Sequence, residues 1–164
     1  MINKYFLEEP NILDLSKEIF NAVVDENLKI ETRFELISKK IEDAETINFI
    51  LADGLGFSNL QSTDSYLNEH INNVVNTTFP SSTNVALTTI AMQANPIDHG
   101  VFSYYMYDKL KYGLINALNW NSENKNLLLS KYFNNQSSIW SVFKENNIHA
   151  VSYTHLTLPT RAVV

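Results

Sequence analysis

Asp53 is the first residue of this sequence whose type and position could do chemistry. It follows a short, mostly apolar run, residues 47–52, and two glycines, Gly54 and Gly56, come just after it. In an open α/β sheet the ligand crevice lies beyond the carboxyl ends of the strands, so a carboxylate here is well placed. Next to glycines that let a ligand approach the backbone, it suits a hard or borderline divalent cation. Alternatively, Asp53 only caps the following turn.

A second candidate is the polar segment 79–84, between an expected strand and an apolar helix. Its hydroxyls, Ser82 and Thr83, would lie at a helix N-terminus, where free N–H groups and a partial positive charge attract anions. A hydroxyl that loses its proton to a base, or whose oxygen is bound by a metal, becomes a competent nucleophile. The alternative is that Ser82 or Thr83 is an ordinary N-cap, which stabilises a helix by about 1 kcal/mol.

A third segment, residues 95–100, reads Asn-Pro-Ile-Asp-His-Gly and completes an ordered trio. The trio resembles the alkaline phosphatase superfamily, in particular its branch of type I phosphodiesterases and nucleotide pyrophosphatases. Members of that branch tend to show a strand ending in Asp-Gly, a Phe-Pro-Ser-Thr-Thr-like segment and a Pro-x-x-His-Gly loop. Residues 101–120 also look like the branch, and the resemblance covers roughly residues 47–150.

The resemblance implies roles for two of these residues. Asp53 matches the family's first metal-binding carboxylate. Thr83, counted back from His99, falls where the family keeps a nucleophilic threonine that binds metal and forms a covalent phosphoryl or nucleotidyl intermediate. Ser82 is the alternative nucleophile if the register slips by one residue. We expect Asp53 and Thr83 to converge on one cation-binding crevice, and His99 to make structural hydrogen bonds rather than to bind metal.

The family's phosphohydrolases use two divalent ions, usually zinc, about 4 Å apart, which hold the attacking and the leaving oxygen. Two ions need more ligands than Asp53 and Thr83 supply. No Asp-x-x-x-His or Asp-His pair that matches the family's later ligands follows His99. We therefore expect this chain alone to bind metal weakly and to turn over little or no substrate.

For the complete protein the resemblance implies a metal-dependent hydrolase of small-molecule phosphate esters, either diesters or monoesters. Sulfatases modify a Cys or Ser within a Cys/Ser-x-Pro-x-Arg pattern, and no such Arg follows Ser81 or Ser82. A phosphomutase would place Ser at the nucleophile position, so Thr83 argues against it. A further alternative is a non-catalytic α/β binding domain, or a degenerate family member, in which Asp53 and Thr83 are only caps.

The elements that would position these residues alternate between helix and strand. Hydrophobic periodicity predicts helices over 12–27, 32–41, 58–70, 83–93 and around 139–143, and strands over 47–52, 74–79 and 148–151. Residues 102–107 are rich in aromatic side chains that could stack a nucleobase or belong to the core, and 113–120 is a strand or a loop. The alternation predicts an α/β fold with a mostly parallel sheet. Together with the resemblance, it implies a partial three-layer sandwich, a truncated alkaline-phosphatase-like domain.

We expect three parts along the chain. Residues 1–45, two helices outside the resemblance, cover the sheet edge or mediate association. Residues 46–150 form the N-terminal part of a phosphodiesterase-like catalytic domain. Residues 151–164 differ in composition, and 151–160 resemble one reading frame of a transposase adapter used for sequencing libraries. We therefore expect a non-native tail on the N-terminal piece of a longer protein.

Composition excludes several classes of function. With 12 Lys+Arg against 18 Asp+Glu the net charge is −6, and no basic run appears, so nucleic acid is not the expected partner. No apolar stretch approaches the roughly 20 residues of a membrane helix, and the N-terminus is too acidic for a signal peptide, so we expect a cytoplasmic location. The lack of Cys excludes thiolate nucleophiles and sulfur-ligated zinc. The oligomeric state is left open.

Overall fold

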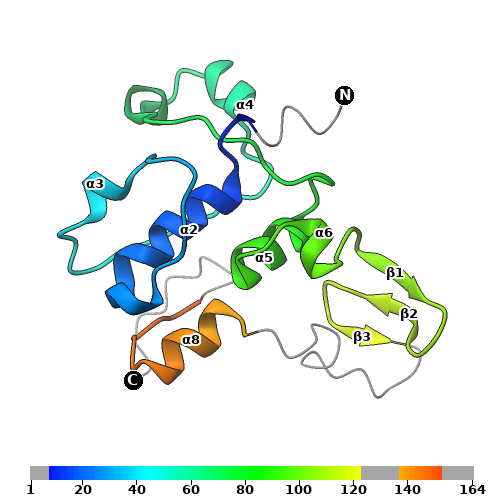
Figure 1. Ribbon diagram of the computed structural model, residues 1–164. Coiled ribbons are helices and arrows are strands. Elements are labelled where there is room, and N and C mark those ends of the chain that lie inside the picture. Colours follow the sequence, from blue (N-terminus) through cyan, green and yellow to red (C-terminus); the bar gives the residue numbers. More distant parts are fainter. Residues whose placement is uncertain (1–7, 123–136, 153–164) are drawn as a thin grey trace, which may run out of the picture.

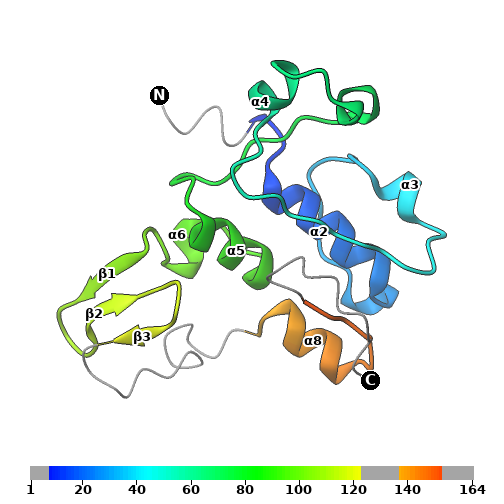
Figure 2. The same cartoon turned by 180° about the vertical axis from the view of Figure 1, so that it is seen from behind.

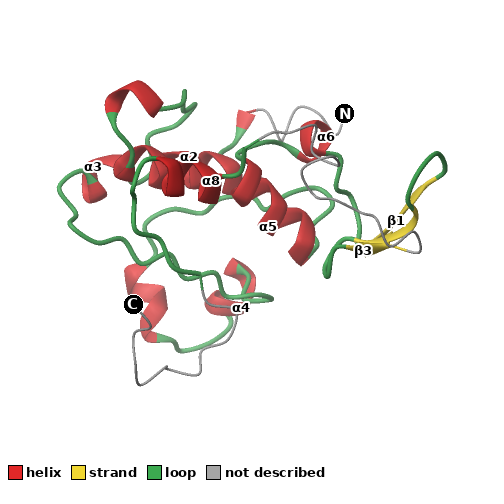
Figure 3. Cartoon of the chain, turned by 90° about the horizontal axis from the view of Figure 1, so that it is seen from below, coloured by secondary structure: helices red, strands yellow, loops and turns green. Residues whose placement is uncertain are grey.

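The computed structural model describes residues 8–122 and 137–152 (Figure 1). Figures 1 and 2 show α5 between α2 on one side and the sheet on the other. Seen from below, the sheet lies at one end of the molecule, beyond the helices (Figure 3). The elements in chain order are α2 (Ile12–Val23), η1 (Glu26–Leu28), α3 (Ser38–Ile41), α4 (Phe57–Gln61), η2 (Tyr66–His70), α5 (Thr83–Met92), α6 (Pro96–His99), β1 (Tyr105–Asp108), β2 (Gly113–Asn116), β3 (Asn121–Ser122) and α8 (Ile139–Glu145).

Helix α2 confirms the first predicted helix and ends earlier than expected. Asn11 caps it by accepting hydrogen bonds from the backbone N–H groups of Leu13 and Asp14, while Asp14 accepts one from the Asn11 N–H. At the other end the Asn21 side chain exchanges hydrogen bonds with the backbone of Ile30, at 2.7 and 2.9 Å. Because this clamp draws the chain back along α2, the helix stops at Val23.

Two buried carboxylates of α2 fasten the following loop. Asp14 and Glu18 are each 2% exposed. Arg33 donates two hydrogen bonds to Asp14, at 2.8 and 2.6 Å, and Glu18 accepts three from the backbone N–H groups of residues 36–38. The helix predicted over 32–41 is therefore shortened to α3, because the backbone before Ser38 is bonded to Glu18 instead of continuing a helix.

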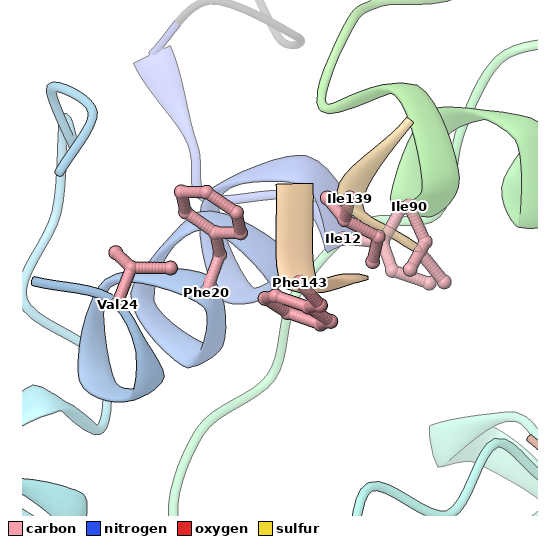
Figure 4. Packing of buried hydrophobic residues seen from close by; sticks show 6 residues of the cluster. All are labelled: Ile12, Phe20, Val24, Ile90, Ile139 and Phe143. Atoms are coloured by element: carbon pink, nitrogen blue, oxygen red, sulfur yellow. The ribbon is translucent and has the colours of Figure 1, made fainter. Parts of the chain in front are cut away.

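The main hydrophobic core lies between α2, α5 and α8 (Figure 4). The Phe20 and Phe143 rings stack with their centroids 5.7 Å apart, and Ile90 of α5 belongs to the same cluster. Burying a side chain of this size contributes about 1.5–3 kcal/mol. The helices predicted at 83–93 and 139–143 are confirmed, and the core fixes the C-terminal half of α5. The buried members of this core are Ile12, Phe20, Val24, Ile90, Ile139 and Phe143.

A second cluster joins the N-terminal half of α5 to the sheet. Val85, Val101 and Ala117 are buried, and Met106 and Trp120 pack against them. The sheet is antiparallel in the order β1-β2-β3, with Tyr105 opposite Asn116 in β1 and β2. The aromatic segment 102–107 thus runs into the edge strand β1, and the segment 113–120 begins with the central strand β2.

The predicted parallel sheet is wrong. Residues 47–52 form no strand, and Phe49, Ile50 and Leu51 are 41%, 74% and 44% exposed instead of buried. An extended segment becomes a strand only when a neighbouring backbone pairs with it, and within the described ranges none pairs with this one. The segment 74–79 makes a single parallel bridge, between Asn76 and Asn11, and 148–151 makes no strand. The described residues therefore form helices and a small antiparallel sheet, not a three-layer sandwich.

The helix predicted from Ser58 to His70 is split into α4 and η2. Gly56, not Ser58, is the N-cap of α4. The side chains of Ser62, Thr63 and Asn68 bond to carbonyl groups at the end of α4, which terminates that helix. Over the described ranges no helix has the length and apolarity to cross a membrane. The expected non-native tail lies outside the described residues from position 153 on.

Candidate active site

Helix α5 places Thr83 at its first position. Ser82 is the N-cap residue, but no side chain caps the helix. The Ser82 hydroxyl instead donates to Oδ1 of Asn84 at 2.9 Å. The N-terminal end of this ten-residue helix therefore keeps its partial positive charge unneutralised by a capping side chain.

The structure brings Asp53 and Thr83 together. The Thr83 hydroxyl Oγ1 donates a hydrogen bond to Asp53 Oδ2 at 3.0 Å. A turn at Gly54, whose φ of 73° suits glycine, follows Asp53, and Asn59 of α4 donates to the Gly54 carbonyl at 3.2 Å. The proximity expected from the sequence is present although residues 47–52 are not a strand. The chemical roles of Asp53 and Thr83 stay predictions.

Tyr104 is a third member of this group that sequence reasoning missed. Its hydroxyl donates to Thr83 Oγ1 at 3.0 Å, so the threonine oxygen has a donor on one side and the Asp53 acceptor on the other. In the sequence Tyr104 is one of several neighbouring aromatic residues, and no spacing signal separates it from the others.

Asn84 holds the backbone next to Tyr104. It is 2% exposed, and its Nδ2 donates to the Ser103 carbonyl at 2.7 Å. The Tyr104 carbonyl also accepts a hydrogen bond from the Ala117 N–H at 2.7 Å. Thr83 and Tyr104 are thus fixed through neighbouring residues. The available sequence signal for Asn84 was an amide side chain on a helix whose other polar residues are all threonines.

His99 makes structural hydrogen bonds, as the sequence predicts. It is 4% exposed, its Nδ1 accepts from the Val101 N–H at 3.1 Å, and Nε2 lies 3.0 Å from the Thr89 hydroxyl. Because Nδ1 accepts, the ring proton is on Nε2 and is donated to Thr89. Burial lowers the pKa of His99 from 6.5 to about 4, against the opposing charge of Asp98. The imidazole therefore ties α6 to α5 in its neutral form.

This lowered pKa predicts a loss of stability in mild acid. Between pH 6.5 and 4 the unfolded chain binds a proton at His99 that the folded chain does not, so the stabilisation is complete above pH 6.5 and is lost as the pH falls toward 4. We expect the free energy of unfolding to drop by about 2 kcal/mol from pH 7.5 to 5 through His99 alone. Chemical denaturation at both pH values measures it.

The matched comparison is His99→Gln against His149→Gln, since His149 is exposed. The first variant should lose this part of the pH dependence and the second should keep it. An equal pH dependence in the His99 variant and the parent would contradict the assignment.

The site offers two oxygen ligands of the types that divalent cations bind, the Asp53 carboxylate and the Thr83 hydroxyl. Across residues 8–122 and 137–152 no group of three or more His, Cys, Asp or Glu side chains could hold a metal ion. A tetrahedral zinc site needs four ligands. The described residues thus fit part of the ligand set of one ion and do not complete a site for two.

Comparison with known proteins identifies the family of this chain. The family model described as Type I phosphodiesterase / nucleotide pyrophosphatase matches residues 48–163, which is more than half of the chain. The chain belongs to this family. Asp53, Thr83 and Tyr104 all lie within the match, whereas α2 and α3 precede it. The resemblance seen in the sequence is confirmed, and membership supports phosphoester hydrolysis at the level of the family. No curated protein and no solved structure matched the chain.

Proposed function

We propose that this family member hydrolyses small-molecule phosphate esters, diesters or monoesters, through a covalent intermediate on Thr83. The observation that carries the proposal is the 3.0 Å hydrogen bond from Thr83 Oγ1 to Asp53 Oδ2 at the N-terminal end of α5. Phosphoryl transfer depends mostly on positioning and on neutralising charge. The helix N-terminus favours phosphate oxygens beside the Thr83 hydroxyl, and the Asp53 carboxylate would hold a cation there.

Thr83 is the proposed nucleophile because its hydroxyl is oriented and partly accessible. The bond to Asp53 directs the hydroxyl proton toward Oδ2 and leaves a lone pair of Oγ1 for phosphorus. In the first displacement the Oγ1–phosphorus bond forms and the bond to the leaving oxygen breaks. The positive end of α5 favours phosphate oxygens beside Thr83. Water then displaces Thr83 from phosphorus and restores the hydroxyl.

The proposal includes two divalent metal ions, for which zinc is the favoured identity. Asp53 and Thr83 would hold one of them. When bound, the ions would supply the positive charge that favours the ionised form of the Thr83 hydroxyl. Because the described residues do not complete either ligand set, we propose that the remaining ligands come from elsewhere in a longer protein.

Removal of metal tests the proposal. In the full-length protein we expect dialysis against a chelator to lower the rate of nitrophenol release from a nitrophenyl phosphodiester or monoester by at least about tenfold. Addition of Zn²⁺ in slight excess should restore the rate. Circular dichroism before and after dialysis checks that the protein stays folded. A metal-free, folded sample with an unchanged rate would contradict the metal dependence, and a full-length protein inactive on both ester types with metal bound would contradict the hydrolase.

A further inference from the structure

We propose that Tyr104 is a further catalytic residue, whose hydroxyl promotes departure of Thr83 Oγ1 from phosphorus in the second displacement. The inference rests on the proposed function, because it takes Thr83 as the nucleophile. Its basis is the hydrogen bond that the Tyr104 hydroxyl donates to Thr83 Oγ1 at 3.0 Å.

Tyr104 is distinguished from the other tyrosines of its segment. Tyr105 and Tyr107 are 61% and 72% exposed, and their hydroxyls make no hydrogen bond with any described residue. Tyr104 is 39% exposed and directs its hydroxyl at the threonine oxygen. The segment thus supplies one aimed donor beside two tyrosines that face solvent.

Neighbouring hydrogen bonds and a buried cluster hold the two residues of this contact in place. Asn84, next to Thr83 in α5, bonds to the Ser103 carbonyl, and Ala117 bonds to the carbonyl of Tyr104. Val85 and Ala117 belong to one buried cluster. The donor and the threonine oxygen are therefore positioned before substrate binds, which is the condition under which a hydrogen bond contributes most to catalysis.

The two displacements make opposite demands on a donor to Oγ1. As the Oγ1–phosphorus bond forms, an electron pair of Oγ1 moves toward phosphorus and negative charge on Oγ1 decreases. When water attacks, the water oxygen–phosphorus bond forms, the Oγ1–phosphorus bond breaks, and the pair returns to Oγ1, which takes up the proton that water releases. Only interactions that strengthen in a transition state accelerate that step. The Tyr104 hydroxyl therefore accelerates breakdown of the intermediate and not its formation.

Tyr104→Phe tests this by removing one partly exposed hydroxyl and keeping the ring. In the full-length protein we expect breakdown of the intermediate to slow by about 10²-fold while its formation changes only a few-fold. Acid-quenched samples should then hold nearly one phosphoryl group per Thr83, with a burst of nitrophenol before a slow steady state. Tyr105→Phe, the same change at the neighbouring exposed position, should behave as the parent does.

The test compares the rate at which the covalent intermediate forms with the rate at which it breaks down. If Tyr104 had a purely structural role, its loss would not slow breakdown selectively. Equal slowing of both steps, or no change in either, would overturn the role of Tyr104. Thr83→Ala distinguishes that failure from a failure of the proposed function. If the alanine variant still accumulates the adduct or turns over normally, Thr83 is not the nucleophile. If it does neither, and Tyr104→Phe partitions as the parent does, only the present inference fails.

Discussion

Replacement of Thr83 by Ala should lower hydrolysis of a nitrophenyl phosphate ester by the full-length protein at least about 10³-fold, because it removes the proposed nucleophile. The oxygen lost is the one that lies between Asp53 and Tyr104. No other hydroxyl has both contacts among the described residues. Steady-state kinetics with matched thermal unfolding curves measure the effect, and kcat should carry most of the loss.

Three neighbouring variants make this result specific. Thr83→Ser keeps a hydroxyl at the position and should retain measurable turnover. Ser81→Ala, at an exposed position outside the contacts described, should leave the rate unchanged. Ser82→Ala tests the alternative register. Loss of activity in the Ser82 variant together with normal activity in Thr83→Ala would move the nucleophile to Ser82 and contradict the account.

Asp53→Asn should lower kcat/KM by at least about 10²-fold, since it keeps the shape of the side chain and removes its charge. The amide still offers an oxygen to the Thr83 hydroxyl, but it is a weak ligand for a cation. We therefore expect zinc bound per protein molecule to fall together with the rate. Kinetics and metal analysis on the same preparation measure both quantities.

The matched control is Asp64→Asn, which removes the same charge at an exposed position. It should leave both the rate and the bound zinc unchanged. A rate that falls equally in the two variants would indicate a general effect of net charge. An Asp53 variant with normal rate and normal zinc would remove Asp53 from the proposed metal site.

The helices were predictable where local pattern determines them. In α2 and α8 the apolar residues that form the core recur at helical spacing, so the sequence contains the burial pattern directly. The shortening of the second helix to α3 was not predictable, because it results from the Glu18 carboxylate bonding to backbone about 18 residues away. The prediction of parallel strands was wrong for a related reason. An apolar run such as 47–52 has strand character in the sequence, but pairing depends on a second segment.

In the site, too, residues marked by a local sequence pattern were predictable and residues defined by distant contacts were not. Asp53 and Thr83 stand at the ends of recognisable segments, and their order along the chain with the His99 loop is what predicts a shared site. Tyr104 and Asn84 were missed because their significance lies in contacts between residues 19 to 21 positions apart, Asn84 with Ser103 and Tyr104 with Thr83. The hydrogen bond between Asp53 and Thr83 forms although residues 47–52 are not the predicted strand. Proximity in this site is produced by side-chain hydrogen bonds as much as by the elements that carry them.

The most direct measurement is peptide mapping by mass spectrometry after the full-length protein is mixed with a phosphate ester and quenched in acid within milliseconds. The account predicts a phosphoryl or nucleotidyl adduct on the peptide that contains Thr83, with fragment ions that place it on that side chain and no adduct in Thr83→Ala. An adduct on another residue of the active protein would contradict the account. So would a Tyr104→Phe variant that turns over more slowly than the parent and yet accumulates no adduct.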